Sequence, residues 1–485
     1  TYRDGIKIDV SKYPNAKPQF SPRFGFNYKP FDDENGSLQI RGGTGLFTGT
    51  PPYVWISNQA GNNGVLFGDL NVRAVKDKND NIISDGRPSL GFTGNMDTYK
   101  PAEGSATRSD IAITDPDFKY PSLWKSNIAA DYKFGDGWVA TVELLYSKDI
   151  NAIYHDNIGL YRTEQFVNDG GAGNARPYYN GYYSDREGNQ KAANHVVMLR
   201  NTSKGHSLYT TFQLQKNFVD GILKGLYLNG SYSFGQSRGV TDGTSSVATS
   251  AWKYRAALDG NAEEVGYTAG SFDGRLLLSA SYTANWSKYA ATSFGLIYQR
   301  YRPFRYSYCY NGDANGDSQF SNDLMYIPAN FDEVKDHLLP GDFDSQEDAW
   351  KAMNAFIEQD PYLSKHRGEY AERNGAVAPF ANQLDLSVSH DIKIYQKNGR
   401  SHTLRFSFNI ANFLNLLNRN WGVVQTTVLG NQQYQFLTIP KGQGPSAANN
   451  YTLKYTMAKD LDETFKDNLN DVSRWQMQFG IKYIF

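Results

Sequence analysis

Apolar and polar residues alternate with a period of two along most of this sequence, and the pattern is clearest at the C-terminal end. Over residues 475–485 the apolar or aromatic positions are Trp475, Met477, Phe479, Ile481, Tyr483 and Phe485. The residues between them are polar or glycine, except for Ile484. Successive side chains of a strand point to opposite faces of a sheet, so this alternation predicts a strand with one apolar and one polar face.

The same alternation recurs in earlier parts of the chain. In the first such segment, Phe20, Phe24, Phe26 and Tyr28 form the apolar set. The segments are residues 20–28, 128–134, 138–146, 208–214, 226–234, 276–286, 384–388 and 404–410. Counting weaker segments, the sequence predicts about 12–16 strands, many near the roughly 10 residues that a tilted strand needs to cross a bilayer.

The connections between these segments alternate between short and long. Tight turns are predicted at residues 134–138, 286–289 and 397–400, where glycine or small polar residues separate two alternating runs. The long polar stretches are residues 69–120, 160–193, 235–269, 311–379 and 431–472. Short turns at one end and long loops at the other are typical of an outer-membrane barrel.

These patterns predict an all-β protein, a transmembrane antiparallel β-barrel with long extracellular loops. A soluble β-sandwich also alternates apolar and polar positions, and it is the main structural alternative. The strand lengths, the aromatic residues near strand ends and the final strand ending in Phe485 favour the membrane barrel.

One long loop is predicted to contain a helix. Ser345 and Asp348 have the spacing of a capping box, and apolar residues follow at helical intervals. The apolar set is Ala349, Trp350, Met353, Phe356 and Ile357. We expect this stripe to pack against neighbouring loops.

Composition narrows the possible functions. Lys and Arg number 49 against 50 Asp and Glu, so no global field points to nucleic acid as a partner. The mean hydropathy of −0.59 and the lack of an apolar run of about 18 residues argue against a helical membrane protein. The single cysteine, Cys309, permits no disulfide, and the 14% aromatic content suits a membrane interface.

A metal site is the one chemical motif with recognisable spacing. Asp313, Asn315 and Asp317 are spaced like the first ligands of a calcium loop, and Asp323 lies close enough to help. Gly316 would allow the sharp turn, but no Glu stands where an EF-hand has its bidentate ligand. A solvated turn rich in Asp, Asn and Gly is the alternative to calcium.

No other group of residues in the sequence predicts a catalytic or metal-binding site. The seven histidines have no metal-binding spacing, and no nucleophile–base pair can be picked out, so we expect no enzyme activity and no further cofactor. Polar residues of the alternating segments are expected to face a wet lumen, where they contact a plug or substrate or are simply solvated: Arg23, Arg41, Asp385, Arg405 and Asn409. Tyrosines of the loops either grip a ligand or form an interface girdle: Tyr178, Tyr179, Tyr182, Tyr183, Tyr301, Tyr306, Tyr308 and Tyr310.

Four segments resemble the TonB-dependent receptors of Bacteroidetes, in particular the Oar-like group. They are FSPRFGFNY at residues 20–28 with RGGTGLF at 41–47 and PPYVWISNQ at 51–59, NGDANGD at 311–317 with NDLMYIP at 322–328, RNG at 373–375 with LDL at 384–386, and FSFNIANFLN at 406–415 with NWG at 420–422. The terminal Phe485 resembles the aromatic residue that the outer-membrane insertion machinery reads. The matches span the whole chain.

This resemblance implies a barrel of about 22 strands with a plug inside. Residues 1–485 would then be the C-terminal portion of the barrel domain, with the plug, the early strands and the TonB-contacting segment upstream. The start at Thr1, without an initiator Met or signal peptide, fits this expectation. The implied partners are outer-membrane lipid and a TonB-type energy-transducing protein, which would act through the missing N-terminal region.

Three functions follow from these observations. The first is energy-coupled transport across the outer membrane of a Gram-negative bacterium, in which the long loops capture the substrate. The second is a self-contained passive channel of about 14 strands. The third is a structural barrel that serves as a platform for surface lipoproteins or a secretion system. The sequence does not name a substrate.

Overall fold

A broad antiparallel sheet dominates the computed structural model of the chain. The structure describes residues 2–63, 110–170, 176–183, 195–243, 245–395, 401–429, 433–445 and 453–485, together with the short strands β3 (Val75–Lys76) and β4 (Ile82–Ile83). Eleven long strands cross the sheet, and we call them the wall: β1 (Arg23–Asp33), β2 (Gly36–Thr48), β6 (Ser122–Phe134), β7 (Trp138–Asp149), β12 (Gly205–Asn217), β13 (Leu226–Gly239), β15 (Phe272–Ser287), β16 (Ala290–Tyr301), β22 (Ala381–Tyr395), β23 (Ser401–Ala411) and β29 (Gln476–Ile484).

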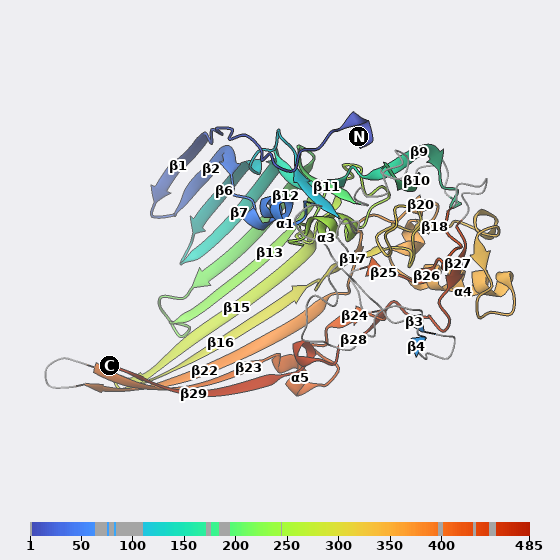
Figure 1. The fold of residues 1–485 in the computed structure, drawn as a ribbon. Coiled ribbons are helices and arrows are strands. Elements are labelled where there is room, and N and C mark those ends of the chain that lie inside the picture. The colour runs from blue at the N-terminus through green and yellow to red at the C-terminus, as the bar shows by residue number, and fades with distance from the viewer. Residues whose placement is uncertain are drawn as a thin grey trace, which may run out of the picture.

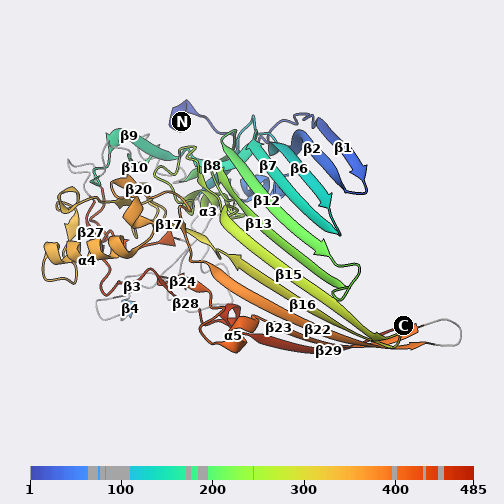
Figure 2. The ribbon, with the colours of Figure 1, turned by 180° about the vertical axis from the view of Figure 1, so that it is seen from behind.

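The wall has a simple up-and-down order. Each strand pairs antiparallel with the wall strand before it and the one after it, and the two-residue strand β14 (Gly266–Tyr267) pairs with β13 as a twelfth member. Among the described residues, the edge strands β1 and β29 pair with β2 and β23 but not with each other. Figures 1 and 2 show them at opposite edges of the sheet. The twelve strands confirm the expected all-β fold, and the described sheet is open.

The connections alternate as predicted. The β6–β7 turn spans residues 135–137, where Gly135 and Gly137 have positive φ angles of 51° and 81°. A Cβ on Gly137 would lie 2.6 Å from the carbonyl oxygen of Asn217, so this turn requires glycine there. The β15–β16 turn at residues 288–289 is also confirmed. The turn predicted at residues 397–400 lies outside the described residues.

At the start of two strands, residues of the predicted alternating run lie outside the strand. Strand β1 begins at Arg23, so Phe20 lies before the wall and is 82% exposed. Pro22 has no N–H group to donate to a ladder, and its carbonyl makes one last bond, to the N–H of Leu46 at 2.9 Å. Strand β29 begins at Gln476, after a short 3-10 turn over Asp471–Ser473 that leaves Trp475 outside it.

The long connections meet at one end of the wall and form what we call the loop layer. It consists of the described parts of residues 49–121, 150–204, 240–271, 302–380 and 412–475. Its strands are β5 (Ile111–Thr114), β8 (Ala152–Asn157), β9 (Leu160–Phe166), β10 (Pro177–Tyr182), β11 (Val196–Thr202), β17 (Arg305–Tyr308), β18 (Tyr326–Ile327), β19 (Leu338–Leu339), β20 (Glu369–Tyr370), β21 (Ala376–Val377), β24 (Gln425–Thr427), β25 (Gln433–Tyr434), β26 (Leu437–Thr438), β27 (Tyr455–Met457) and β28 (Phe465–Asp467). Its helices are α1 (Tyr53–Gly61), α3 (Ala248–Lys253), α4 (Gln346–Gln359) and α5 (Phe413–Leu417). Figures 1 and 2 show this layer at the end of the wall far from the C-terminus.

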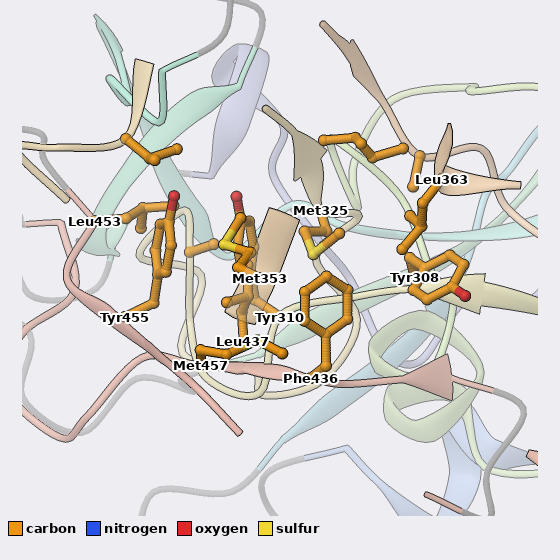
Figure 3. Packing of buried hydrophobic residues seen from close by; sticks show 14 of the residues in the cluster. Tyr308, Tyr310, Met325, Met353, Leu363, Phe436, Leu437, Leu453, Tyr455 and Met457 are labelled. Atoms are coloured by element: carbon orange, nitrogen blue, oxygen red, sulfur yellow. The ribbon is translucent and has the colours of Figure 1, made fainter. Parts of the chain in front are cut away.

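The main hydrophobic core lies in the loop layer. Its largest buried cluster has 24 residues drawn from three of the long connections, residues 150–204, 302–380 and 412–475. Figure 3 shows Tyr308, Met325, Met353 and Phe436 among the side chains packed there. The predicted helix is confirmed, since the Ser345 hydroxyl accepts a hydrogen bond from the Asp348 N–H at 3.0 Å. In the described part of the chain, no helix is both long and apolar enough to cross a membrane.

Candidate functional site: the polar face and the loop layer

One face of the wall carries large apolar side chains that are open to the surroundings. Phe294, Val388, Phe408 and Phe479 stand opposite one another across four neighbouring strands. Phe479 is 65% exposed, and the other three residues of this row are also unburied. Such a row would be unstable in water, but it matches the outward face of a strand in contact with lipid.

The other face of the wall is polar and internally bonded. The Arg41 Nε donates to Asp131 at 2.9 Å, and the Thr141 hydroxyl donates to the same carboxylate at 2.7 Å. Arg405 makes two bonds to Asp391 on the adjacent strand, at 2.6 and 2.8 Å. These pairs hold the long side chains against the strands. A face of the wall in contact with water can therefore stay ordered.

The remaining residues predicted for the polar face have protein partners as well. Asn409 accepts a bond from the Ser387 hydroxyl at 2.7 Å. Asp385 accepts the backbone N–H of Asn412 at 2.8 Å, where the chain leaves the wall. The guanidinium carbon of Arg23 lies 4.4 Å from the ring centroid of Phe47. These side chains therefore stabilise the packing of neighbouring strands. Any contact with a plug or substrate would be an additional role.

The two predicted roles of the loop tyrosines are wrong for most of them. Tyrosines at the centre of the loop layer are almost completely buried: Tyr178, Tyr179, Tyr306, Tyr308 and Tyr310. They neither form an interface girdle nor present a ring to a ligand. Tyr306 and Tyr308 lie on β17, and side chains of other loops cover this strand. Tyr182 and Tyr183 are half-buried, and Tyr301 donates its hydroxyl to Gln383 at 3.2 Å.

The buried hydroxyl of Tyr308 is bonded to a buried carboxylate. Asp360 is fully buried, and its Oδ2 accepts hydroxyl bonds from Tyr308 at 2.5 Å and from Thr464 at 2.7 Å. Its Oδ1 accepts the backbone N–H groups of Tyr362 and Leu363 at 2.9 and 2.8 Å. Four donors compensate for the loss of water around this carboxylate, so the loop layer has a polar anchor inside its apolar core.

The four predicted calcium ligands lie in one largely buried turn. Asp313 accepts three backbone N–H groups, those of Asn315, Gly316 and Ser318, at 2.7–3.2 Å. Asp317 accepts the Gln319 N–H at 2.8 Å. Asp323 reaches back to the Ala314 N–H at 2.8 Å. The turn needs Gly316, whose φ is 81° and whose missing Cβ would lie 2.2 Å from the Tyr179 carbonyl oxygen.

A fully buried arginine that the sequence did not single out joins this turn. The Arg176 Nε donates to Asp169 at 3.0 Å, and its Nη1 donates to Asp323 at 3.3 Å. The guanidinium lies near the rings of Tyr310 and Tyr370. Arg176 stands 147 residues from Asp323 in the sequence, and no local pattern marks it. It balances part of the negative charge of the turn.

The balance of charge in this turn is incomplete. Arg176 is paired with Asp169 and Asp323, while no ion pair reaches Asp313 or Asp317 from the described Lys, Arg and His residues. Burial raises the pKa of Asp313, and burial together with Asp323 and Asp313 raises the pKa of Asp317 well above its usual value. Burial also raises the pKa of Asp323 to about 7, against the opposing effect of Arg176.

The geometry of the turn does not by itself form a metal centre. Within the described ranges, no three His, Cys, Asp or Glu side chains converge closely enough to hold a metal ion. The carboxylate oxygens accept backbone N–H groups of their own loop. The chemistry of the donors, oxygen alone with excess negative charge, is nevertheless that of a calcium loop, and calcium stays a prediction.

The final residue, Phe485, is the predicted outer-membrane insertion signal. Phe485 follows directly after β29, is 91% exposed, and stacks on Tyr483 with ring centroids 5.8 Å apart. Figure 1 shows the C-terminus at the end of the wall with the short turns. This position agrees with the predicted role of Phe485 but does not test it.

Comparison with known proteins identifies the class. Residues 5–450 match the family model of the outer membrane beta barrel domain, and the chain belongs to that family. It is therefore an outer-membrane protein of a Gram-negative bacterium. No curated protein matches the sequence significantly.

The structure has a low level of similarity to several solved outer-membrane proteins. A mutant of the ferric enterobactin receptor PfeA from Pseudomonas aeruginosa aligns over 96% of this chain and 40% of its own, with 9% identity and a TM-score of 0.37. The outer membrane transporter YddB from Escherichia coli aligns over 92% and 38%, with 9% identity and a TM-score of 0.37. The FrpB iron transporter from Neisseria meningitidis aligns over 80% and 39%, with 8% identity and a TM-score of 0.29. This chain thus spans about two fifths of the length of these proteins.

Proposed function

We propose that this chain forms the later part of the barrel of a TonB-dependent transporter of the Oar-like group. The observation that carries the proposal is a packed loop layer on one end of an eleven-strand wall. A passive channel needs only loops that leave its mouth clear, whereas a capture device needs loops held in fixed positions. Family membership and the ordered series of motifs from residue 20 to residue 422 also support this role.

The open edges of the wall bear on how the barrel closes. Strands β1 and β29 each present a row of backbone groups with no partner strand within the described structure. Such groups are costly in lipid, where no water can satisfy them. We propose that further strands of the same barrel pair with both edges. The self-contained channel requires β1 to pair with β29, and the described sheet has no such pair.

The proposed partners follow from this role. A plug would contact the polar face of the wall, and a TonB-type protein would pull on the plug from the periplasm. A surface lipoprotein is a further candidate partner at the loop layer. Calcium is proposed in the turn containing Asp313, Asn315, Asp317 and Asp323, where it would offset the excess buried charge. The proposed work is binding and transfer, without covalent chemistry.

Binding of a TonB-type protein tests the proposal. The whole protein would be extracted from outer membranes in mild detergent and titrated with the purified periplasmic domain of a TonB-type protein. We expect a one-to-one complex and, in planar bilayers, little steady conductance because a plug closes the lumen. A large constant conductance without TonB binding would contradict the transporter and support the passive channel.

A further inference from the structure

A polar cavity of about 410 Å³ lies inside the loop layer. It is bordered by the segment after β13, by α3 and the residues that follow it, by β17, by residues 373–374 and by β25. Its charged lining residues are Arg255, Arg373 and Asp242. The volume falls in the usual range for sites that hold small molecules. We call this cavity the arginine pocket.

The two arginines of the pocket are buried and form no ion pair within the described part of the chain. Arg255 and Arg373 are 6% and 4% exposed. Arg255 donates to the carbonyl oxygens of Val240, Gly260 and Ala262. Arg373 donates to carbonyl oxygens of the β13 and β14 region, including that of Tyr267 at 3.4 Å. Neither forms an ion pair with any described carboxylate, in contrast to buried Arg176, which has two.

Donor groups also remain unused. A guanidinium has five N–H groups, and Arg255 makes only three hydrogen bonds. Its buried Nε finds no partner within the described part of the chain. Carbonyl oxygens supply dipoles but no full negative charge, so the positive charge of both groups is only partly compensated.

The charged side chains that line the pocket are positive on balance, with two arginines and one aspartate. Among the described lining residues Asp242 alone is acidic, and its two oxygens already accept the Ala269 N–H and the Asn374 side-chain amide, both at 3.0 Å. Burial lowers the pKa of Arg255, which Glu264 and Asp259 oppose. Burial and the charge of Arg255 lower the pKa of Arg373 to about 10. Both arginines stay charged at neutral pH, and a bound anion would stabilise both.

The uncharged lining groups indicate what surrounds the anion. Thr241, Ser307, Asn374, Gln433 and Gln435 line the cavity with hydroxyl and amide groups. Groups of this kind both donate and accept hydrogen bonds, as the hydroxyl groups of a sugar do. Tyr254, which is 58% exposed, adds an aromatic ring to the lining. Large aliphatic side chains, which an apolar or peptide ligand would need, are missing from the described lining.

We propose that the arginine pocket binds an acidic saccharide, with the carboxylate of a uronic acid between Arg255 and Arg373 and the sugar hydroxyls on the amide and hydroxyl groups. The inference rests on the proposed function only in treating this saccharide as the imported substrate. Binding itself requires neither a plug nor TonB, so it can be measured separately.

The test compares three probes, of which the first two share the same sugar backbone and differ at the carboxyl group. Calorimetry on the whole protein in detergent would use trigalacturonate and its methyl ester, with a triglutamate peptide as a third probe. We expect trigalacturonate to bind about tenfold or more tightly than the ester, which lacks the charge that a buried arginine recognises. Equal binding of the two, no binding of trigalacturonate, or tighter binding of triglutamate would overturn the proposal.

Three variants locate the site. Arg373→Gln should weaken trigalacturonate binding about tenfold or more, while Arg367→Gln, in the loop layer but outside the pocket, should leave it unchanged. Arg373→Gln also removes hydrogen bonds between loops, so weaker binding by this variant alone does not locate the anion. Asp242→Asn is a second variant, for which the expected change in binding is in the opposite direction. Removal of its negative charge should strengthen binding about threefold. Weaker binding by Asp242→Asn would overturn the assignment of the anion to this pocket.

Failure of the pocket and failure of the proposed function give different results. If trigalacturonate does not bind but the TonB complex forms, the transporter stands and the saccharide is wrong. If trigalacturonate binds but no TonB complex forms, the pocket stands and energy-coupled transport is wrong.

Discussion

In the wall, large apolar side chains face outward, whereas in the loop layer they face one another. Phe479 of the wall is 65% exposed, and Phe356 of the loop layer is 1% exposed. The buried apolar side chains of the wall are mostly small, as at Ala129 and Ala381. The wall therefore depends on lipid to cover its apolar surface, while the loop layer builds its own core as a water-soluble domain does. One region of the chain therefore folds in contact with lipid, and the other folds in contact with water.

The largest effect that separates the two regions is expected from the loop core. Phe356→Ala should destabilise the loop layer by about 3–5 kcal/mol, because it leaves a cavity beside Tyr434 and Phe436. Limited proteolysis would show faster cleavage of the loops, while the wall still shifts on gels only after boiling. Phe320→Ala, at a loop position 68% exposed, is the control and should change little. Loss of the wall's gel shift in Phe356→Ala would show that the two regions do not fold separately.

A charge on the outward face of the wall should have a comparable but smaller effect. Phe408→Arg is expected to cost about 2–4 kcal/mol if this position meets the middle of the bilayer. Urea titration in lipid vesicles measures the change. Ser407→Leu, the next residue and on the opposite face, is the matched control. Little effect from Phe408→Arg together with a large effect from Ser407→Leu would mean that the lipid and lumen faces are reversed.

Calcium should act on the loop layer alone. If the acidic turn binds it, calcium at about a hundred times its Kd should stabilise the loops by about 2.7 kcal/mol. Thermal unfolding with calcium and with a chelator would measure this difference, and Asp317→Asn should reduce it. Equal stability in both conditions would favour the solvated turn instead.

Acid should also distinguish the regions. His155 on β8 packs against Trp55, and burial together with Arg255 lowers its pKa from 6.5 to about 4. The folded protein keeps this histidine neutral while the unfolded chain takes up a proton, so stability falls as pH drops below 6.5. The loss should reach about 2 kcal/mol between about pH 7 and about pH 5. His155→Gln should remove this part of the pH dependence of loop unfolding, and His366→Gln should retain it. An unchanged slope in His155→Gln would contradict the assignment.

The wall could be predicted from sequence because its determinants are local. Alternation at Leu404, Phe406 and Phe408 sets both the strand and its outward face, and the glycines at 135 and 137 set the turn. The loop layer could be predicted only where a local signal exists, as at the Ser345 cap of α4 and in the acidic turn. The solvent that each face meets is not local, which is why the buried tyrosines were misassigned.

The same limit applies to the candidate sites. The sequence placed Asp313 and Asp323 in one turn because they are ten residues apart. It did not find Arg176, nor the arginine pocket, where Arg255 and Arg373 meet from loops 118 residues apart. Two arginines in polar loops look like solvated residues until their neighbours are known.

The connectivity of the wall has a consequence for how quickly each region forms. Each wall strand pairs with the next wall strand, and five of the ten pairs are joined by short turns, so those five hairpins can form locally. The loop core instead joins Val167 to Met457, and contacts between such distant segments are slow to form. We therefore expect the loop core to assemble late, after the short wall hairpins have formed. During that interval the apolar core of the loops is open to surface proteases and chaperones.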